Sequence, residues 1–287
     1  MIPACNEEEH LGGLLTSLVA ASEHRPLRII VVCNGCTDRT EDVARGFAGV
    51  DVLVSEVAAK HAALNAGDDS AGDAFPRFYA DGDIQIDPAS MCRLIAAVDA
   101  EAPRAAGPSV RFDLSGSPWL ARAFVQTNER LPFYEYWHAA RLQGRGIYGT
   151  NRAGRARFGR FPAIRSDDGF FDLFFDDDER VVVEDAFVTV SCPTSVGELL
   201  RNQTRVAEGF RELEAWARAN HPRGITHFEG ASGKGWRDAD LWRRSAFVAG
   251  LRRGSGVPDA VGFAVVEAMT RANALVRRTL GREVQWR

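Results

Sequence analysis

The sequence has no apolar run of the roughly 18 to 20 residues that would cross a bilayer. Its start also lacks the pattern of a signal peptide, because acidic side chains follow Asn6 where a basic stretch and an apolar core would be needed. The five cysteines are an odd number scattered over 287 residues, so they do not form a disulfide framework. These absences predict a protein of the reducing cytoplasm.

A strong net charge is missing as well. The formal charge of -4 gives no electrostatic reason to expect a nucleic-acid partner. The six histidines show no metal-ligand spacing, and no internal repeat occurs. With 45% hydrophobic and 26% charged residues, the composition is that of a globular protein long enough for one large α/β domain with a helical appendage.

The first two-fifths of the chain alternates between strand-like and helical patterns. Leu11, Leu14, Leu15 and Leu18 recur at helical spacing, and Arg28–Cys33 is a β-branched run typical of a strand buried on both faces. Such alternation predicts a parallel, doubly wound sheet. We predict strands at 28–33, 52–54 and 77–80, and helices at 11–19, 37–47, 60–68 and 88–98.

The first and last parts of the chain are less regular. Met1-Ile2-Pro3 leaves little room for a first strand of about five residues. Either residues precede Met1 or the sheet compensates, and we favour the former. Further elements are expected as strands at 105–112 and 180–183, and as helices at 119–141, from Ser195 onward and at 258–280.

A carboxylate pair, Asp81-Gly82-Asp83, follows the apolar strand predicted at 77–80. Ligands of a parallel sheet bind beyond the carboxyl ends of its strands, and Asn34-Gly35 lies at another such end. Two carboxylates at this place can share one hard divalent cation, Mg²⁺ or Mn²⁺, which prefers oxygen ligands. Alone, however, the triplet is more often a solvated turn.

Several further blocks change this interpretation. Pro3–Glu8, Ile30–Asp38 and Asp81–Asp83, with Lys60 and Asn65-Ala66-Gly67 in between, resemble the glycosyltransferase family 2 pattern in order and spacing. The resemblance covers about 200 of the 287 residues and continues more weakly to Arg205. It implies a GT-A fold, a Rossmann-like, mostly parallel central sheet flanked by helices, with a nucleotide-sugar donor and Mg²⁺ or Mn²⁺. We assign 1–212 to the GT-A domain, with a nucleotide-sugar half (1–103) and an acceptor half (104–212), and 213–287 to a C-terminal helical extension.

The resemblance implies donor-binding roles for eleven residues. The family commonly has Asp at position 34, whereas Asn34 is uncharged and adds two donors, so UDP-, GDP- and dTDP-sugars all stay open. Lys60 is expected at the diphosphate or base, the alternative being a solvated lysine at a helix start. Asp81 and Asp83 are the expected metal ligands. The full donor set is Pro3, Ala4, Glu7, Asn34, Asp38, Lys60, Asp81, Gly82, Asp83, Arg201 and Arg205.

Inverting transfer needs a base that deprotonates the attacking hydroxyl in line with the leaving group. Asp167-Asp168 matches the acidic dipeptide that carries this base in the family, and we expect Asp168 to be the base. Both residues could instead cap a following helix, which is compatible with catalysis. The later run Asp176–Glu179 is expected to be a solvated loop.

Arg201 and Arg205 would lie on one helix face at i and i+4, where they could clamp the diphosphate. Processive family members have Gln-x-x-Arg-Trp here, whereas this chain has Asn202-Gln-Thr-Arg205-Val206. The lost Gln and Trp predict non-processive transfer. Cys33-Asn-Gly-Cys36 has no partner Cys-x-x-Cys and is expected to be structural rather than a redox or zinc site.

The segment from Trp236 to Arg287 is rich in arginine, with Trp242, Phe247, Leu251, Phe263 and Val266 among the basic residues. Such helices can bind the inner face of a membrane, which would favour a lipid-linked acceptor. They can equally be packing elements with a solvated face. The acceptor is otherwise an unidentified hydroxyl compound, whose pocket is expected to include Trp119, Trp137 and Tyr134–Tyr136.

Two other functions remain open. A nucleotidyltransferase acting on sugar phosphates also binds nucleotides on an α/β sheet, but its first loop should be Gly-rich and basic, the opposite of Asn6-Glu7-Glu8-Glu9. A non-catalytic scaffold protein of GT-A fold would not need Asp81, Asp83 and Asp168. The sequence therefore favours a metal-assisted, inverting glycosyltransferase.

Overall fold

The computed structural model describes residues 1–130, 137–220 and 257–279. Contacts within it divide the chain into two units, which are described separately below. Among the described residues, the first unit contains 1–113 and 140–191, and the second contains the remainder.

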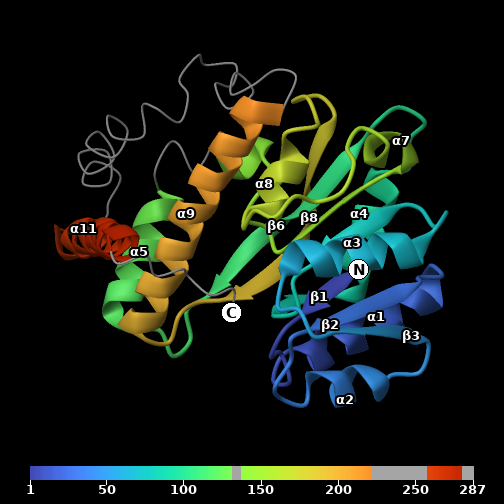
Figure 1. Cartoon of the computed structure of the whole chain (residues 1–287), viewed down its shortest axis with the longest axis horizontal. Coiled ribbons are helices and arrows are strands. Elements are labelled where there is room, and N and C mark those ends of the chain that lie inside the picture. Colours follow the sequence, from blue (N-terminus) through green and yellow to red (C-terminus); the bar gives the residue numbers. More distant parts are fainter. Residues whose placement is uncertain (131–136, 221–256, 280–287) are drawn as a thin grey trace. The chain divides into compact units, whose positions relative to one another are not determined.

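A three-stranded parallel sheet forms the N-terminal part of the first unit (Figure 1). The fully buried run at 29–34 is its central strand, as its β-branched sequence predicts. Residues on alternate sides of this strand meet different helices: Ile30 and Val32 pack with Ala63 of α3, whereas Ile29 and Val31 belong to the cluster that contains Leu14 of α1. The elements are β1 (Ile2–Ala4), α1 (Leu11–His24), β2 (Ile29–Asn34), α2 (Thr40–Arg45), β3 (Val50–Ser55) and α3 (Lys60–Ala71).

A second sheet of five strands has the order β4-β7-β6-β8-β5. Only β6 and β8 pair in parallel, and the β4–β7, β6–β7 and β5–β8 pairs are antiparallel. The α/β fold class is confirmed. Parallel pairing, as predicted, joins β1, β2 and β3 and also the long β6–β8 pair, whereas the other three pairs of the second sheet are antiparallel. The elements are β4 (Arg77–Ala80), β5 (Ile84–Ile86), α4 (Pro88–Ala97), β6 (Ala105–Asp113), β7 (Ile147–Thr150), α7 (Arg152–Arg155), α8 (Asp167–Asp172) and β8 (Arg180–Ser191).

Met1 links the two sheets. Its amino group donates to Phe78 O at 2.8 Å, and its carbonyl accepts from Ala80 N at 3.0 Å, the pattern of a parallel pair. The short β1, whose three residues are all buried, therefore lies beside β4. As a result the loops after β1, β2 and β4, which carry Glu7, Asp38 and the Asp81–Asp83 triplet, leave the sheets at one edge.

The second unit contains α5 (Trp119–Glu129), α9 (Val196–Asn220) and α11 (Val257–Thr279). Phe124 and Phe263 stack with ring centroids 5.2 Å apart, and Leu199 and Val266 complete a small core. α9 runs unbroken across the domain boundary predicted at residue 212. In the part of the chain that is described, no helix is both long and apolar enough to traverse a bilayer.

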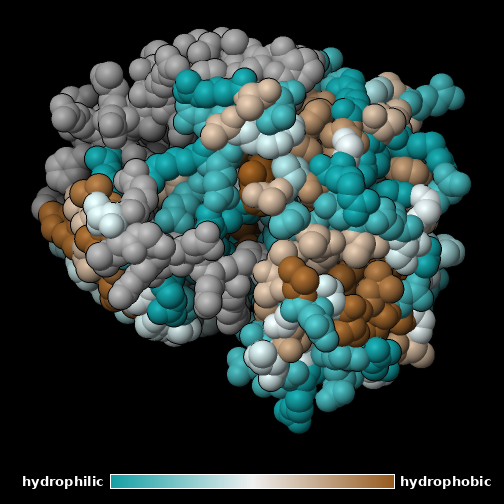
Figure 2. Space-filling view, in the orientation of Figure 1, coloured by the Kyte–Doolittle hydropathy of each residue, from teal (hydrophilic) through white to brown (hydrophobic). Residues whose placement is uncertain are grey.

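Phe263 and Val266 thus serve packing, one of the two expectations for the basic C-terminal segment. Val261, Val265 and Met269 on α11 are exposed. Figure 2 shows hydrophobic surface, in brown, where Figure 1 places α11. Trp242, Phe247 and Leu251 lie outside the described residues, as does the Tyr134–Tyr136 stretch.

Candidate active site

The loops after β1 and β2 are locked together by hydrogen bonds. Asn6, which has a left-handed backbone (φ 59°), accepts from Thr37 N at 2.8 Å, and Asp38 accepts from Glu8 N at 3.1 Å. Although burial acts to raise it, bonds from Thr40 and Glu8 lower the pKa of Asp38. Asp38 therefore organises the loop between β2 and α2.

Asn34 is completely buried at the end of β2. When the side-chain amide is oriented with its nitrogen inward, this nitrogen lies 3.0 Å from Ala4 O and 3.2 Å from Val32 O. Both neighbours are acceptors, so this position requires a donor, and an ionised Asp would face two carbonyl oxygens. The structure gives Asn34 a role in joining β1 to β2.

The Asp81-Gly82-Asp83 triplet follows β4 directly, as predicted. Asp81 N donates to Gly146 O at 2.8 Å, which fixes the start of the turn. A Cβ at Gly82 would lie 3.0 Å from Glu7 Cγ, so glycine allows the first loop to approach the turn closely. The Asp81 side chain is 41% exposed and Asp83 is exposed, so carboxylate oxygens face solvent at this edge.

Lys60, the first residue of α3, connects this turn to the acidic dipeptide. Its Nζ lies 2.6 Å from Asp81 Oδ1 and 2.9 Å from Asp167 Oδ1. Its side chain is 19% exposed. Burial alone would lower the pKa of Lys60, but the charges of Asp167 and Asp81 outweigh it and raise the pKa. Lys60 is therefore a fixed cation of the site and not a solvated lysine.

Asp167 and Asp168 begin α8 but differ in environment. Asp167 is buried, and its second oxygen accepts from Tyr148 Oη at 2.7 Å, so both of its oxygens are engaged. Asp168 is half-buried and accepts from Gly144 N at 2.6 Å and Gly169 N at 2.7 Å. Burial and the neighbouring Asp167 charge raise the pKa of Asp168 to about 6. A carboxylate with this pKa is ionised at neutral pH and still basic enough to accept a proton.

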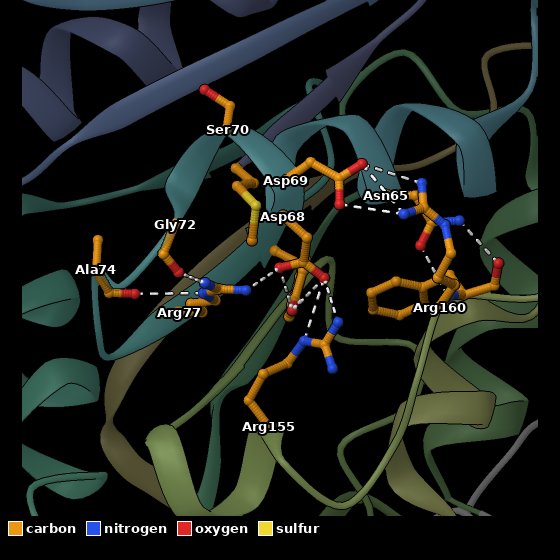
Figure 3. A network of polar contacts seen from close by, with 12 residues as sticks. Asn65, Asp68, Asp69, Ser70, Gly72, Ala74, Arg77, Arg155 and Arg160 are labelled. Carbon is orange, nitrogen blue, oxygen red and sulfur yellow. Dashed lines mark hydrogen bonds and ion pairs between the residues drawn. The ribbon is translucent and has the colours of Figure 1, made fainter.

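A buried ionic network behind the site fixes α3 against the segment after β7 (Figure 3). Asp68 pairs with Arg77 at 2.9 Å and with Arg155 at 2.8 Å. Asn65, one turn earlier on α3, exchanges two hydrogen bonds with the backbone of Phe161. Removing one partner of a buried ion pair is strongly destabilising, so these contacts keep α3 in place. Lys60, the first residue of α3, is thereby held in a defined position.

The metal-binding prediction can be tested on the donor set. Within 1–130, 137–220 and 257–279, no three His, Cys, Asp or Glu side chains are grouped so that they could hold a metal ion. Asp81 and Asp83 supply hard oxygen ligands only, which suits Mg²⁺ or Mn²⁺ completed by substrate phosphates. The residues therefore fit a cation bound together with a diphosphate.

The remaining predicted residues are divided between the two units. Pro3 and Ala4 are buried in β1, and Glu7 lies in the following turn. Arg201 and Arg205 are exposed on α9 in the second unit, so the first unit brings together the other nine donor residues without them. Cys33 and Cys36 are free thiols, and burial raises the pKa of Cys33 to about 12, as expected for a structural role.

Sequence reasoning missed three groups of the site. No strand is among the predicted elements around Tyr148, yet Ile147–Thr150 is strand β7. Gly144 N and Ser166 Oγ, which contact Asp168, carry no motif of their own. The available signal for the strand was the apolar pair Ile147 and Tyr148 directly after Gly144 and Gly146, which both have positive φ.

Residues 1–159, more than half of the chain, match the sequence profile of Glycosyl transferase family 2. No protein of curated function matches the chain in sequence. Mannosyltransferase PcManGT from Pyrobaculum calidifontis, solved with GDP-Man and Mn²⁺, aligns at 16% identity with a TM-score of 0.59, covering 98% of this chain and 86% of that one. TarS 1–349 from S. aureus in complex with UDP aligns at 15% identity with a TM-score of 0.48, covering 95% of this chain and 90% of that one.

The likeness to PcManGT shows the fold, and the profile match shows the family. The chain has the GT-A fold, belongs to glycosyl transferase family 2 and is a glycosyltransferase.

Proposed function

We propose that this protein transfers a sugar from a nucleoside-diphosphate sugar to a hydroxyl acceptor, with inversion, divalent-metal dependence and one sugar per encounter. The observation that carries the proposal is the bridge formed by Lys60. One ammonium contacts both Asp81, in the expected metal-binding turn, and Asp167, in the dipeptide that contains the expected base. Donor-side and acceptor-side carboxylates are therefore within reach of each other.

On the donor side, Asp81 and Asp83 would hold the cation, which supplies Lewis-acid stabilisation of the departing diphosphate. Lys60 can transfer one of its three N–H donors from Asp81 to a phosphate oxygen, because a phosphate is also a strong anionic acceptor. The interlocked loops at Asn6–Glu8 and Thr37–Asp38 would form the wall of the nucleotide site.

On the acceptor side, Asp168 would take the proton from the attacking hydroxyl. Its raised pKa matches this task, and two backbone N–H groups hold its carboxylate in place. Asp167 would keep Lys60 and the dipeptide aligned, because its oxygens already serve Lys60 and Tyr148. Arg201 and Arg205 stay candidates for the diphosphate clamp.

Donor binding tests the proposal directly. The thermal unfolding midpoint should rise with one of UDP-glucose, UDP-GlcNAc, GDP-mannose or dTDP-glucose plus Mn²⁺; the PcManGT complex makes GDP-mannose the first choice. Asp83→Ala should lose the Mn²⁺-dependent part of the shift. No shift with any donor would favour the non-catalytic scaffold, whereas a shift with nucleoside triphosphates alone would favour a nucleotidyltransferase. With a suitable acceptor, the anomeric proton coupling of the product reports inversion.

A further inference from the structure

Two stacked tyrosines connect the acidic dipeptide to the interior of the first unit. Tyr79 on β4 and Tyr148 on β7 are direct cross-strand partners, and their rings stack with centroids 5.3 Å apart. Each hydroxyl donates to a buried carboxylate: Tyr148 Oη to Asp167 at 2.7 Å, and Tyr79 Oη to Asp68 at 3.0 Å. Burial, with the adjacent Asp charge, raises the pKa of both phenols, so both remain donors.

Both carboxylates are connected to α3. Asp68 lies on α3, two turns after Lys60, which itself bonds Asp167 at 2.9 Å. The contacts thus close a ring: Lys60, Asp167, Tyr148, Tyr79, Asp68 and back along α3. Arg77 and Arg155 neutralise Asp68 within this ring (Figure 3).

The ring explains how the Asp167 carboxylate is held in one orientation, which the donor-site residues alone do not achieve. α8 has only six residues, and its first turn carries both acids. Asp167 meets Lys60 on one oxygen only, so a second contact is required to fix its orientation. Tyr148 supplies this contact from a strand that is itself paired with β4 and β6.

We propose that Tyr148 is a positioning residue, which sets Asp167 opposite Lys60 and thereby fixes the spacing between the donor-side turn and Asp168. Tyr79 and Asp68 support it from the other side of the ring. The catalytic consequence rests on the function proposed above, whereas the geometric claim does not.

Tyr148→Phe tests the proposal, because it removes only the hydroxyl and keeps the stacked ring. Lys60 is one of two lysines in the sequence, so its acylation rate can be followed by mass spectrometry with Lys234 as the internal reference. We expect acylation of Lys60 relative to Lys234 to rise about fivefold as the ring opens. On the donor that the wild-type protein turns over, kcat should fall about 10- to 100-fold with KM changed less than about threefold.

Ser90→Ala is the matched control. It also removes a buried hydroxyl that bonds an aspartate, Asp87 at 2.5 Å, but on α4 and outside the ring. It should lower the unfolding midpoint without changing Lys60 acylation or kcat. Tyr79→Phe opens the ring at Asp68 and leaves the Tyr148–Asp167 bond, so a smaller rise in Lys60 acylation is expected. This variant replaces Tyr148→Phe as the test if Tyr148→Phe folds poorly.

The outcomes separate the two claims. Acylation of Lys60 at the wild-type rate in Tyr148→Phe, or in Tyr79→Phe if only that variant folds, would overturn the positioning role. Unchanged kcat in a folded Tyr148→Phe would do the same. Faster acylation together with no turnover of any donor by the wild-type protein would support the positioning role and contradict the proposed function.

Discussion

Lys60 Nζ lies 2.9 Å from Asp167 Oδ1 and not from Asp168, although the two acids are adjacent in the chain. This pairing separates their roles. Asp167 is held as a structural anion by Lys60 and Tyr148, whereas Asp168 contacts backbone N–H groups and keeps a raised pKa.

Asp168→Asn should slow transfer strongly. An amide cannot accept the proton of the attacking hydroxyl, and the loss of a positioned base costs about 10²- to 10⁴-fold in rate. The control is Asp178→Asn, an exposed acid in the loop before β8, which should leave the rate unchanged. Initial rates under saturating donor measure both variants, and a rate within about twofold of wild type for Asp168→Asn would remove the base from the mechanism.

The pH dependence should reflect the pKa of Asp168, which is about 6. Because the base works only when ionised, the rate should fall as pH drops through 6, whereas an unshifted carboxyl would keep the rate high to about pH 4. The folded-state pKa is raised above the unfolded value, so ionised Asp168 lowers stability above pH 6. The wild-type protein should therefore lose stability as pH rises from about 4 to about 6, and Asp168→Asn should lack this part of the pH dependence.

Lys60→Met should change the affinities for Mn²⁺ and for the nucleoside diphosphate in opposite directions. Without the ammonium, Asp81 loses its partner at 2.6 Å, and Mn²⁺ should bind the nucleotide-free variant about 3- to 10-fold more tightly. The nucleoside diphosphate should bind about tenfold more weakly, because one charge-assisted contact is lost. Lys60→Arg keeps the charge and should change Mn²⁺ affinity least. Titration calorimetry measures all three proteins; identical Mn²⁺ affinities would exclude competition between Lys60 and the cation.

Asn34→Asp should destabilise the fold although it restores the residue common in the family. The ionised carboxylate would face Ala4 O and Val32 O without a donor, at a cost of about 2 to 3 kcal/mol. Urea unfolding should show a lower midpoint with an unchanged m-value. A variant as stable as the wild-type protein would mean that the Asn34 side chain is not held inside.

Periodicity was a good guide to the first half of the fold and a poor one to the second. The β-branched run of β2 and the leucine spacing of α1 belong to elements buried by local neighbours, so their patterns predict them. β7 is only four residues long and has no periodic pattern of its own, so its partners β4 and β6, distant in sequence, define it. The acids at 81, 83, 167 and 168 were found by resemblance, but the bond from Tyr148 that separates Asp167 from Asp168 is a tertiary contact.

The most direct test of the central claim is release of nucleoside diphosphate from a nucleotide-sugar panel in the presence of Mn²⁺, for wild type and Asp83→Ala. We predict that wild type turns over at least one UDP-, GDP- or dTDP-sugar and that Asp83→Ala is at least about 100-fold slower on the same donor. Turnover by Asp83→Ala at the wild-type rate, or none by either protein with any donor, would contradict the assignment of this site.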